Sequence, residues 1–446
     1  MPTIIGVIFF CAGAYCFLRK EDGLLGMLII ASVFEASSAL NVAERGIQPH
    51  YVIATFIIAR ALLNGVLGFR PGGPMPQGKW LLIFGAVAIF ATLVFPFVFA
   101  GTPIYDPKLG IDEPTRPPLQ FGLNNVAQAV FVAWHIAAAY AVLHIRYSAK
   151  TTRRVYIFAF YLALAFVFAQ SFCSLTGLPY PDSVFRNNPG YGIVELEKIS
   201  HGVRCPGTFT EPSIAGAFIA MYGVSFLAEY LTGKGGVFRV VIALLGVGLI
   251  ASSGALLSLA ICFVILAICY SPFRLPWYIN IRQARRIVGI SFLIVAPVIL
   301  LLAVSAGYRD TLLMLTVSKG ETGSFLNRTA SDLYGLQLFV QTYGLGLGLG
   351  SNRSSSLFTT LLSCVGLIGT FSFGMFYSRL FADLPEQYAW LKWAAIALLV
   401  NMIIDISDVT FPLLWLPILL AIQFSQDGAA SRQKLNYGDR VQFVEG

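Results

Sequence analysis

The chain has 446 residues, of which 57% are hydrophobic and only 12% are charged, and its mean hydropathy is +0.74. Soluble globular proteins are about 45–50% apolar and about 25% charged, so this composition cannot supply a water-soluble surface. The apolar content excludes a disordered chain, and the net charge of +8 is too small and too scattered to indicate a nucleic-acid partner. What remains is a protein that crosses a bilayer several times.

Apolar runs of the length that a bilayer requires repeat along the whole chain. A helix needs about 20 residues to span a hydrocarbon core about 30 Å thick, which predicts an all-α, polytopic membrane protein with about 12–14 transmembrane helices. We expect one membrane domain at residues 1–425 and a polar cytoplasmic tail at 426–446. The predicted spans are 3–18, 23–41, 51–69, 80–100, 121–145, 155–176, 213–231, 238–251, 254–271, 287–306, 356–378, 389–406 and 409–424.

Lysine and arginine residues concentrate in every second connection between the predicted spans. Short connections that are rich in these residues stay in the cytoplasm, which places those around Arg19, Arg146 and Arg274 there. The two long connections, 177–212 and 307–355, then lie on the outer side. Because connections longer than about 15 residues are usually functional or disordered, we expect the working face to be the outer one.

The first outer loop carries polar residues directly before a predicted span. It contains Arg204, and Glu211 and Pro212 stand where a helix is expected to begin. Proline suits a first helical turn and a carboxylate is stabilised there, so Glu211 is either a helix cap or a functional acid. Cys173 and Cys205 flank this loop and form either a disulfide, which is permitted outside the cytoplasm, or two free thiols.

The second outer loop contains Asn327, Arg328 and Asp332, followed by Asn352 and Arg353. Arg328 and Asp332 are four residues apart and would meet on one helix face, either as a surface ion pair or as part of a site. Arginine binds phosphate oxygens through two parallel hydrogen bonds and stays charged. The arginines of the two outer loops therefore predict recognition of an anionic lipid head group.

Alternate glycines occupy positions 344–350 of the same loop. Such a run is superficially similar to a phosphate-binding loop. A nucleotide site, however, requires a strand before the loop and a helix after it, and its ligand is usually cytosolic. The outer position therefore argues against an ATP site. Two interpretations stay open, namely close approach of the backbone to another ligand and a flexible turn into the next span.

Glu35 and Arg60 fall on adjacent predicted spans at comparable predicted depth. Charged side chains inside a membrane are costly and usually pair with one another or line a polar cavity. We expect a structural Glu35–Arg60 pair, with the wall of a substrate cavity as the alternative. Asp405 and Asp408 lie near the outer end of a late span and would contribute to the same cavity.

Histidine is nearly absent, with four residues in the chain. No two histidines are three or four residues apart and no Cys-x-x-Cys motif is present, so the sequence does not indicate a metal site. A serine–histidine–acid arrangement is also not indicated, because no nucleophile-elbow motif is present. We therefore expect a site that works with neither metal nor cofactor.

The two outer loops resemble those of the bacterial O-antigen and exopolysaccharide polymerase family, which includes the O-antigen ligases. Residues 204–213 read Arg-x-x-Gly-Thr-Phe-x-Glu-Pro-Ser and open a span. The further matches, in the order of the family, are Asn327-Arg328-Thr with Asp332, Tyr343-Gly-Leu-Gly-Leu-Gly, Ser351-Asn-Arg353 and Val365-Gly-Leu-Ile-Gly369. The likeness covers roughly residues 150–425.

The resemblance implies a metal-independent glycosyltransferase of the GT-C type in the bacterial inner membrane. Its expected function is the polymerisation of undecaprenyl-pyrophosphate-linked oligosaccharide units at the periplasmic face, into exopolysaccharide or O-antigen. Expected partners besides the bilayer and this lipid are chain-length regulators and export proteins. The expected catalytic residues are Glu211, as first candidate for the base, Arg204, Arg328 and Asp332, and the expected pyrophosphate or glycan contacts are Arg353, Asn327, Asn352 and Arg60.

Two alternatives to a polymerase stay open. Ligases of the family carry a His-Asn pair shortly before the Gly-Leu-Ile-Gly turn, where this chain has Ser355-Ser356, which favours the polymerase. A flippase or transporter is the alternative from another class. Transporters often show internal repeats and broken helices at mid-membrane, and no such repeat is evident in the sequence.

Overall fold

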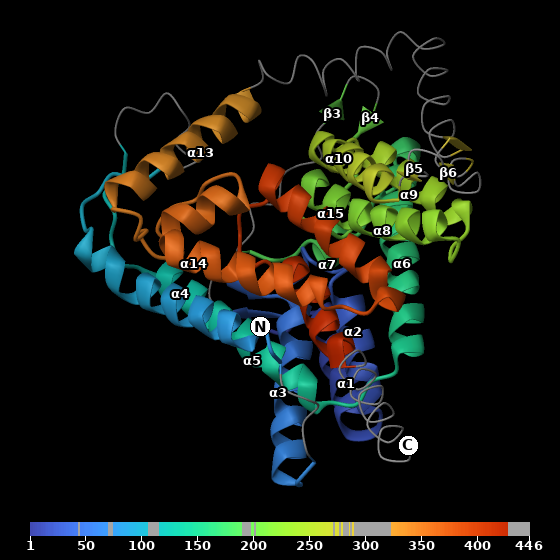
Figure 1. The fold of residues 1–446 in the computed structure, drawn as a ribbon, viewed down its shortest axis with the longest axis horizontal. Coiled ribbons are helices and arrows are strands. Elements are labelled where there is room, and N and C mark those ends of the chain that lie inside the picture. The colour runs from blue at the N-terminus through green and yellow to red at the C-terminus, as the bar shows by residue number, and fades with distance from the viewer. Residues whose placement is uncertain are drawn as a thin grey trace.

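A computed structural model of the chain describes residues 1–42, 45–69, 75–105, 116–189, 198–199, 202–270, 273–275, 278–279, 285, 288–289 and 323–426. This part is all-α except for three antiparallel two-stranded hairpins (Figure 1). Seven of its helices are long and apolar enough to cross a membrane. The chain therefore has the helices of a multi-pass membrane protein.

The helices fall into those that are long and apolar enough to span a membrane and the others. The seven long helices are α3 (Pro49–Val66), α4 (Gly78–Val98), α5 (Leu123–Ala141) continued by η2 (Val142–His144), α6 (Ala149–Thr176), α8 (Pro212–Thr232), α14 (Leu357–Ala382) and η4 (Glu386–Tyr388) with α15 (Ala389–Asp405). The other helices are α1 (Ile4–Arg19), η1 (Glu21–Gly23), α2 (Leu24–Ala31), α7 (Asp182–Phe185), α9 (Val237–Ile250), α10 (Ser253–Cys269), α13 (Gly323–Gln341) and the C-terminal helix Pro412–Gln426. The strands are β1 (Leu40–Val42), β2 (Arg45–Ile47), β3 (Lys198–Ile199), β4 (Gly202–Val203), β5 (Phe273–Leu275) and β6 (Tyr278–Ile279).

The predicted span at 23–41 is wrong beyond Ala31. Helix α2 ends at Ala31, and the chain then continues without regular structure to β1. The backbone of this segment bonds to the first outer loop instead, since Ala36 N–H donates to the Thr208 carbonyl (3.1 Å) and Asn188 N–H to that of Ala36 (3.2 Å). The predicted span at 287–306 falls almost wholly outside the described residues, as does the predicted tail beyond residue 426.

Three sets of helices pack on one another (Figure 1). Helix α4 packs against α5 and α14, α8 packs against α9, α10 and α15, and α3 packs against α1, α2 and α5. Helix α8 is mostly apolar, and 83% of the residues in its most apolar 18-residue stretch are buried. Such burial is expected of a helix at the centre of a bundle. Its first residue, Pro212, follows Glu211, so the first outer loop leads directly into the core of this group.

The second outer loop contains a long helix. Its described part begins with α13, a helix of 19 residues that packs on α14 (Figure 1). Leu338 and the partly buried Tyr334 contact Leu119 and Leu347, so the connection between α4 and α5 also covers this helix. The outer connections therefore pack on one another as a layer over the ends of the helices.

The alternate glycines at 344–350 pack backbone against backbone. All four have positive φ, and a Cβ on Gly346 would lie 2.6 Å from the carbonyl carbon and oxygen of Cys364. Helix α14 is broken at Gly366 (φ 67°, ψ −169°), and Gly348 N–H donates to the Cys364 carbonyl (2.8 Å). Of the two interpretations of this run, the structure shows a tight entry into the next span, fixed by close helix contact.

A methyl group at Gly346 has no space, so Gly346→Ala is expected to lower the free energy of unfolding. The strained φ alone costs about 1–3 kcal/mol, and the backbone clash adds to it. The melting temperature in detergent measures the loss. Gly374→Ala, on the lipid-facing side of α14 with nothing within 4 Å, is the control and should melt at or above the wild-type temperature. Equal melting of both variants would show that the Gly346 contact is not tight.

Candidate functional site

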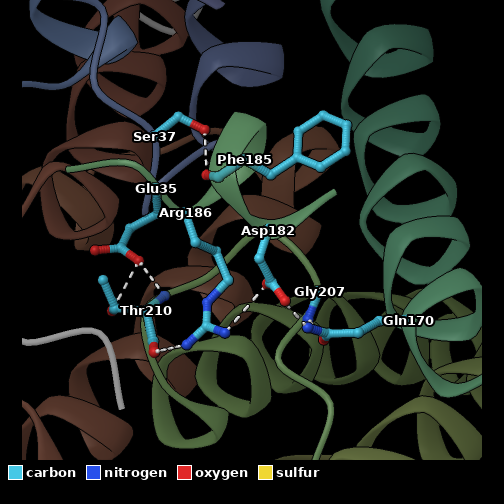
Figure 2. Close-up of polar contacts among 8 residues, drawn as sticks. All are labelled: Glu35, Ser37, Gln170, Asp182, Phe185, Arg186, Gly207 and Thr210. Carbon is cyan, nitrogen blue, oxygen red and sulfur yellow. Dashed lines mark hydrogen bonds and ion pairs between the residues drawn. The ribbon is translucent and has the colours of Figure 1, made fainter. Parts of the chain in front are cut away.

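A network of buried polar contacts fixes the chain directly before α8 (Figure 2). Glu35 Oε2 accepts hydrogen bonds from the backbone N–H and the hydroxyl of Thr210, both at 3.0 Å. The Thr210 carbonyl accepts from Nη2 of Arg186 at 3.1 Å. Both backbone polar groups of Thr210 are thus held by charged side chains that are 3% and 4% exposed. Since Glu211 is the next residue, the network fixes where its backbone enters α8.

A second set of contacts ties this network to α6 (Figure 2). Arg186 forms an ion pair with Asp182 at 3.2 Å, and Asp182 also accepts from Nε2 of Gln170 at 3.4 Å. The other end of the Gln170 amide, Oε1, accepts from the backbone N–H of Gly207 at 2.7 Å. A buried side chain of a long helix therefore holds both ends of the first outer loop.

Glu211 occupies the N-cap position of α8 without capping the helix through its side chain. Its carboxylate forms no capping hydrogen bond to the first turn. It accepts instead from the Ser213 hydroxyl at 3.0 Å, and the residue is half-buried. The interpretation of Glu211 as a mere cap therefore loses its main support, and the carboxylate keeps accepting capacity for another partner.

The structure brings the four predicted catalytic residues together. Burial lowers the pKa of the Arg328 guanidinium, Glu211 raises it, Arg204 lowers it and Asp332 raises it, so all three act on Arg328 at electrostatic range. Arg328 also forms an ion pair with Asp405, whose side chain is 8% exposed. Arg328 is thus in contact with the end of α15 and at electrostatic range of charged residues from both outer loops.

The ion pair of Arg328 is with Asp405 and not, as the four-residue spacing suggested, with Asp332. Oδ1 of Asp332 accepts from the backbone N–H groups of Ser355 (2.8 Å) and Ser356 (3.0 Å) and from the Thr359 hydroxyl (2.7 Å). The N-cap of α14 is Ser356, so these bonds hold the two residues that lead into the helix and one side chain of its first turn. Asp332 therefore anchors α13 to the first turn of α14, which favours a structural role.

The predicted glycan-contacting residues of the second loop divide into two kinds. The backbone carbonyl of Asn327 accepts a hydrogen bond from the Tyr105 hydroxyl at 3.3 Å. The buried Asn352 donates from Nδ2 to the Ser363 hydroxyl at 3.3 Å. Arg353 is exposed and forms no hydrogen bond or ion pair with any residue that the structure describes. The asparagines hold the loop in place, whereas the arginine presents its charge outward.

The predicted Glu35–Arg60 pair is wrong. Arg60 pairs with Glu21 at 3.0 Å and donates to the Phe17 carbonyl at 3.2 Å. Glu21 lies between α1 and α2, in the connection assigned to the cytoplasmic side, so Arg60 points to the opposite end of the helices from Thr210. The cause is the short α2, which leaves Glu35 in the outer segment. Arg60 does not join the other candidate residues.

Cys173 and Cys205 are not joined by a disulfide in this structure. Cys205 is buried and Cys173 is partly exposed. Of the two alternatives for this pair, the structure therefore shows the unbonded one. The fixed position of the first outer loop depends on the Glu35–Arg186 network rather than on a disulfide.

Glu35 gives the network a pH dependence. It lies outside the spanning helices, and burial raises its pKa to about 7 against the lowering effect of the Thr210 hydrogen bonds and Arg186, with Glu211 also raising it. A raised carboxyl pKa means that the native state binds more protons than the unfolded chain between pH 4.5 and about 7, so stability falls as pH rises through this window. At 1.36 kcal/mol per pKa unit the loss is about 3 kcal/mol.

Glu35→Gln removes this titration and keeps an oxygen that accepts from Thr210. The unfolding free energy of the wild type relative to the variant is expected to fall by about 3 kcal/mol between pH 4.5 and pH 8. Melting of both proteins across this range in detergent measures the difference. If the difference in unfolding free energy between the wild type and the variant does not change with pH, the pKa of Glu35 is not raised in the folded protein.

Sequence reasoning missed Arg186 and did not assign Asp405 to Arg328. The four-residue spacing of Asp182 and Arg186 was an available signal for the first. Within the described ranges, no group of three or more histidine, cysteine or acidic residues is arranged to hold a metal ion. Comparison of the sequence with protein-family models and with curated proteins finds no match.

Proposed function

We propose that the chain is a GT-C-type glycosyltransferase that polymerises undecaprenyl-pyrophosphate-linked oligosaccharide units at the periplasmic face of the bacterial inner membrane. The observation that carries the proposal is that Arg204 and Glu211, the residue directly before α8, lie at electrostatic range of Arg328. These residues come from two outer loops that are far apart in the sequence. They are also the residues of the motifs on which the resemblance to the polymerase family rests.

The proposed reaction needs charge and position more than covalent help. The hydroxyl of the next unit attacks the anomeric carbon of the growing glycan, a C–O bond to the acceptor forms, and the C–O bond to pyrophosphate breaks. Undecaprenyl pyrophosphate leaves with the bonding electron pair. Arg204 and Arg328 stabilise the negative charge that develops on it, and Glu211 accepts the hydroxyl proton. The diphosphate is already a good leaving group, so orientation supplies much of the remaining acceleration.

The position of the cluster suits a lipid-borne substrate. The connections assigned to the cytoplasm meet one another at the other ends of the helices, as Arg146 does with Glu21 through a 2.7 Å hydrogen bond and as Gln77 does with Asp383 through one of 2.6 Å. The candidate residues lie where the outer connections converge. A head group at the membrane surface reaches that level while its lipid chain stays in the bilayer.

The experiment is turnover by the purified protein in nanodiscs, supplied with undecaprenyl-pyrophosphate oligosaccharide and without ATP. Products are separated by length on a gel. A ladder of lengthening glycans is the expected result. A single transfer to a different acceptor would indicate a ligase. No covalent change, together with movement of the lipid across vesicle membranes, would replace the enzyme with a flippase.

A further inference from the structure

Asp405 is a buried acid with a defined partner. It is the last residue of α15, its side chain is 8% exposed, and its Oδ1 forms the ion pair with Nη1 of Arg328. A charge so far from water is retained in a fold only when it is paired. The Arg328 side chain is 33% exposed, so the pair has a buried acidic half and a basic half that reaches the surface.

The second oxygen of Asp405 faces a different element. A Cβ built on Gly254 would lie 2.6 Å from Oδ2 of Asp405. Gly254 is the second residue of α10, so the carboxylate lies against the start of that helix, where negative charge is stabilised. Only glycine leaves room for the carboxylate there. Asp405 is thus fixed on the α10 side and holds Arg328 with its other oxygen.

We propose that Asp405 is a positioning residue, which aims the Arg328 guanidinium at the diphosphate without contacting the substrate. This inference rests on the proposed function. Arginine carries five N–H donors in a planar fork. An ion pair at Nη1 fixes the plane of the fork and leaves the other donors for phosphate oxygens. Without Asp405 the fork has no defined direction when the leaving group develops its charge.

The test uses two variants that disturb Asp405 in different ways. Asp405→Ala removes the carboxylate, whereas Gly254→Ala leaves it in the chain and displaces it. The kcat for chain extension, normalised to folded protein recovered by gel filtration, is expected to fall about 100-fold for Asp405→Ala and in the same direction for Gly254→Ala. Gly374→Ala, a helical glycine with nothing within 4 Å, is the control and should keep the wild-type kcat.

A double variant separates positioning from an independent role. If Asp405 acts through Arg328, adding Asp405→Ala to Arg328→Ala should cause no further loss of residual turnover. Should Asp405→Ala yield no folded protein, Asp405→Asn keeps the volume and one hydrogen bond, and a kcat between those of the wild type and Arg328→Ala is expected. A role in folding alone would reduce the yield and leave the kcat of the folded fraction unchanged.

The outcomes distinguish this inference from the function beneath it. An active wild type whose Asp405→Asn and Gly254→Ala variants keep full kcat overturns the positioning role and leaves the polymerase proposal standing. Multiplicative losses in the double variant also overturn it, because Asp405 would then act apart from Arg328. A wild type that extends no glycan overturns both.

Discussion

Arg328→Ala is expected to slow glycan chain extension about 100- to 1,000-fold while the protein still inserts into the membrane. The size is that of removing one preorganised donor from a site where negative charge develops. Arg328 forms an ion pair with Asp405 and lies at electrostatic range of Glu211 and Arg204. We expect that Arg204 cannot also donate from the position that the Arg328 guanidinium occupies. The measurement is the rate of ladder growth, normalised to the amount of membrane-inserted protein.

Two further variants give this expectation its controls. Arg328→Lys keeps the charge and loses the planar fork, so it should retain only part of the activity. Arg379→Ala removes an exposed arginine near the other end of α14 and should leave the rate at the wild-type value. Because loss of Arg328 leaves Asp405 buried and unpaired, the melting temperature of Arg328→Ala should also fall. Wild-type extension by Arg328→Ala would remove this residue from the site.

Glu211→Gln is expected to lower kcat about 100- to 10,000-fold, which is the usual contribution of a positioned general base. Glutamine has nearly the same shape and can still accept from the Ser213 hydroxyl, so the entry into α8 should not change. The KM for the lipid-linked oligosaccharide should change little, because the lost interaction belongs to the transition state. Steady-state rates over a range of substrate concentrations provide both constants.

Glu386→Gln serves as the matched control, since Glu386 is exposed at the start of η4. It should behave as the wild type does. Asp332→Asn is informative in another way, because the hydrogen bonds of Asp332 to the residues that lead into α14 predict a loss of stability rather than of kcat. Full kcat in Glu211→Gln combined with a large loss in Asp332→Asn would transfer the base role to Asp332.

The long helices were predictable because their signal is local. An apolar run of about 20 residues identifies a membrane-spanning helix whatever surrounds it. The end of helix α2 at Ala31 was not predictable. The chain beyond it forms backbone hydrogen bonds from Ala36 to the first outer loop, whose position no local pattern reveals. The same holds for α13, where Leu338 and Tyr334 are covered by Leu119 from a distant connection.

The pairings of the candidate residues could not be predicted from the sequence, and their roles stay predictions. Arg204 and Glu211 lie at electrostatic range of Arg328. The expected partner of Arg328 followed from helical spacing, which describes exposed pairs, whereas the real partner is buried on α15. The pairing of Arg60 failed because depth in a membrane follows from where a helix begins and ends, and α3 begins at Pro49 while α2 is short.

The most direct test of the proposed reaction is the amount of undecaprenyl pyrophosphate released for each glycosidic bond formed, by the wild type and by Arg328→Ala in parallel. One molecule of the lipid diphosphate released per bond, with both events slowed together in Arg328→Ala, is the expected result. Release and bond formation at the wild-type rate in Arg328→Ala would contradict the assignment of the diphosphate to Arg328. No release from the wild type would contradict the reaction itself.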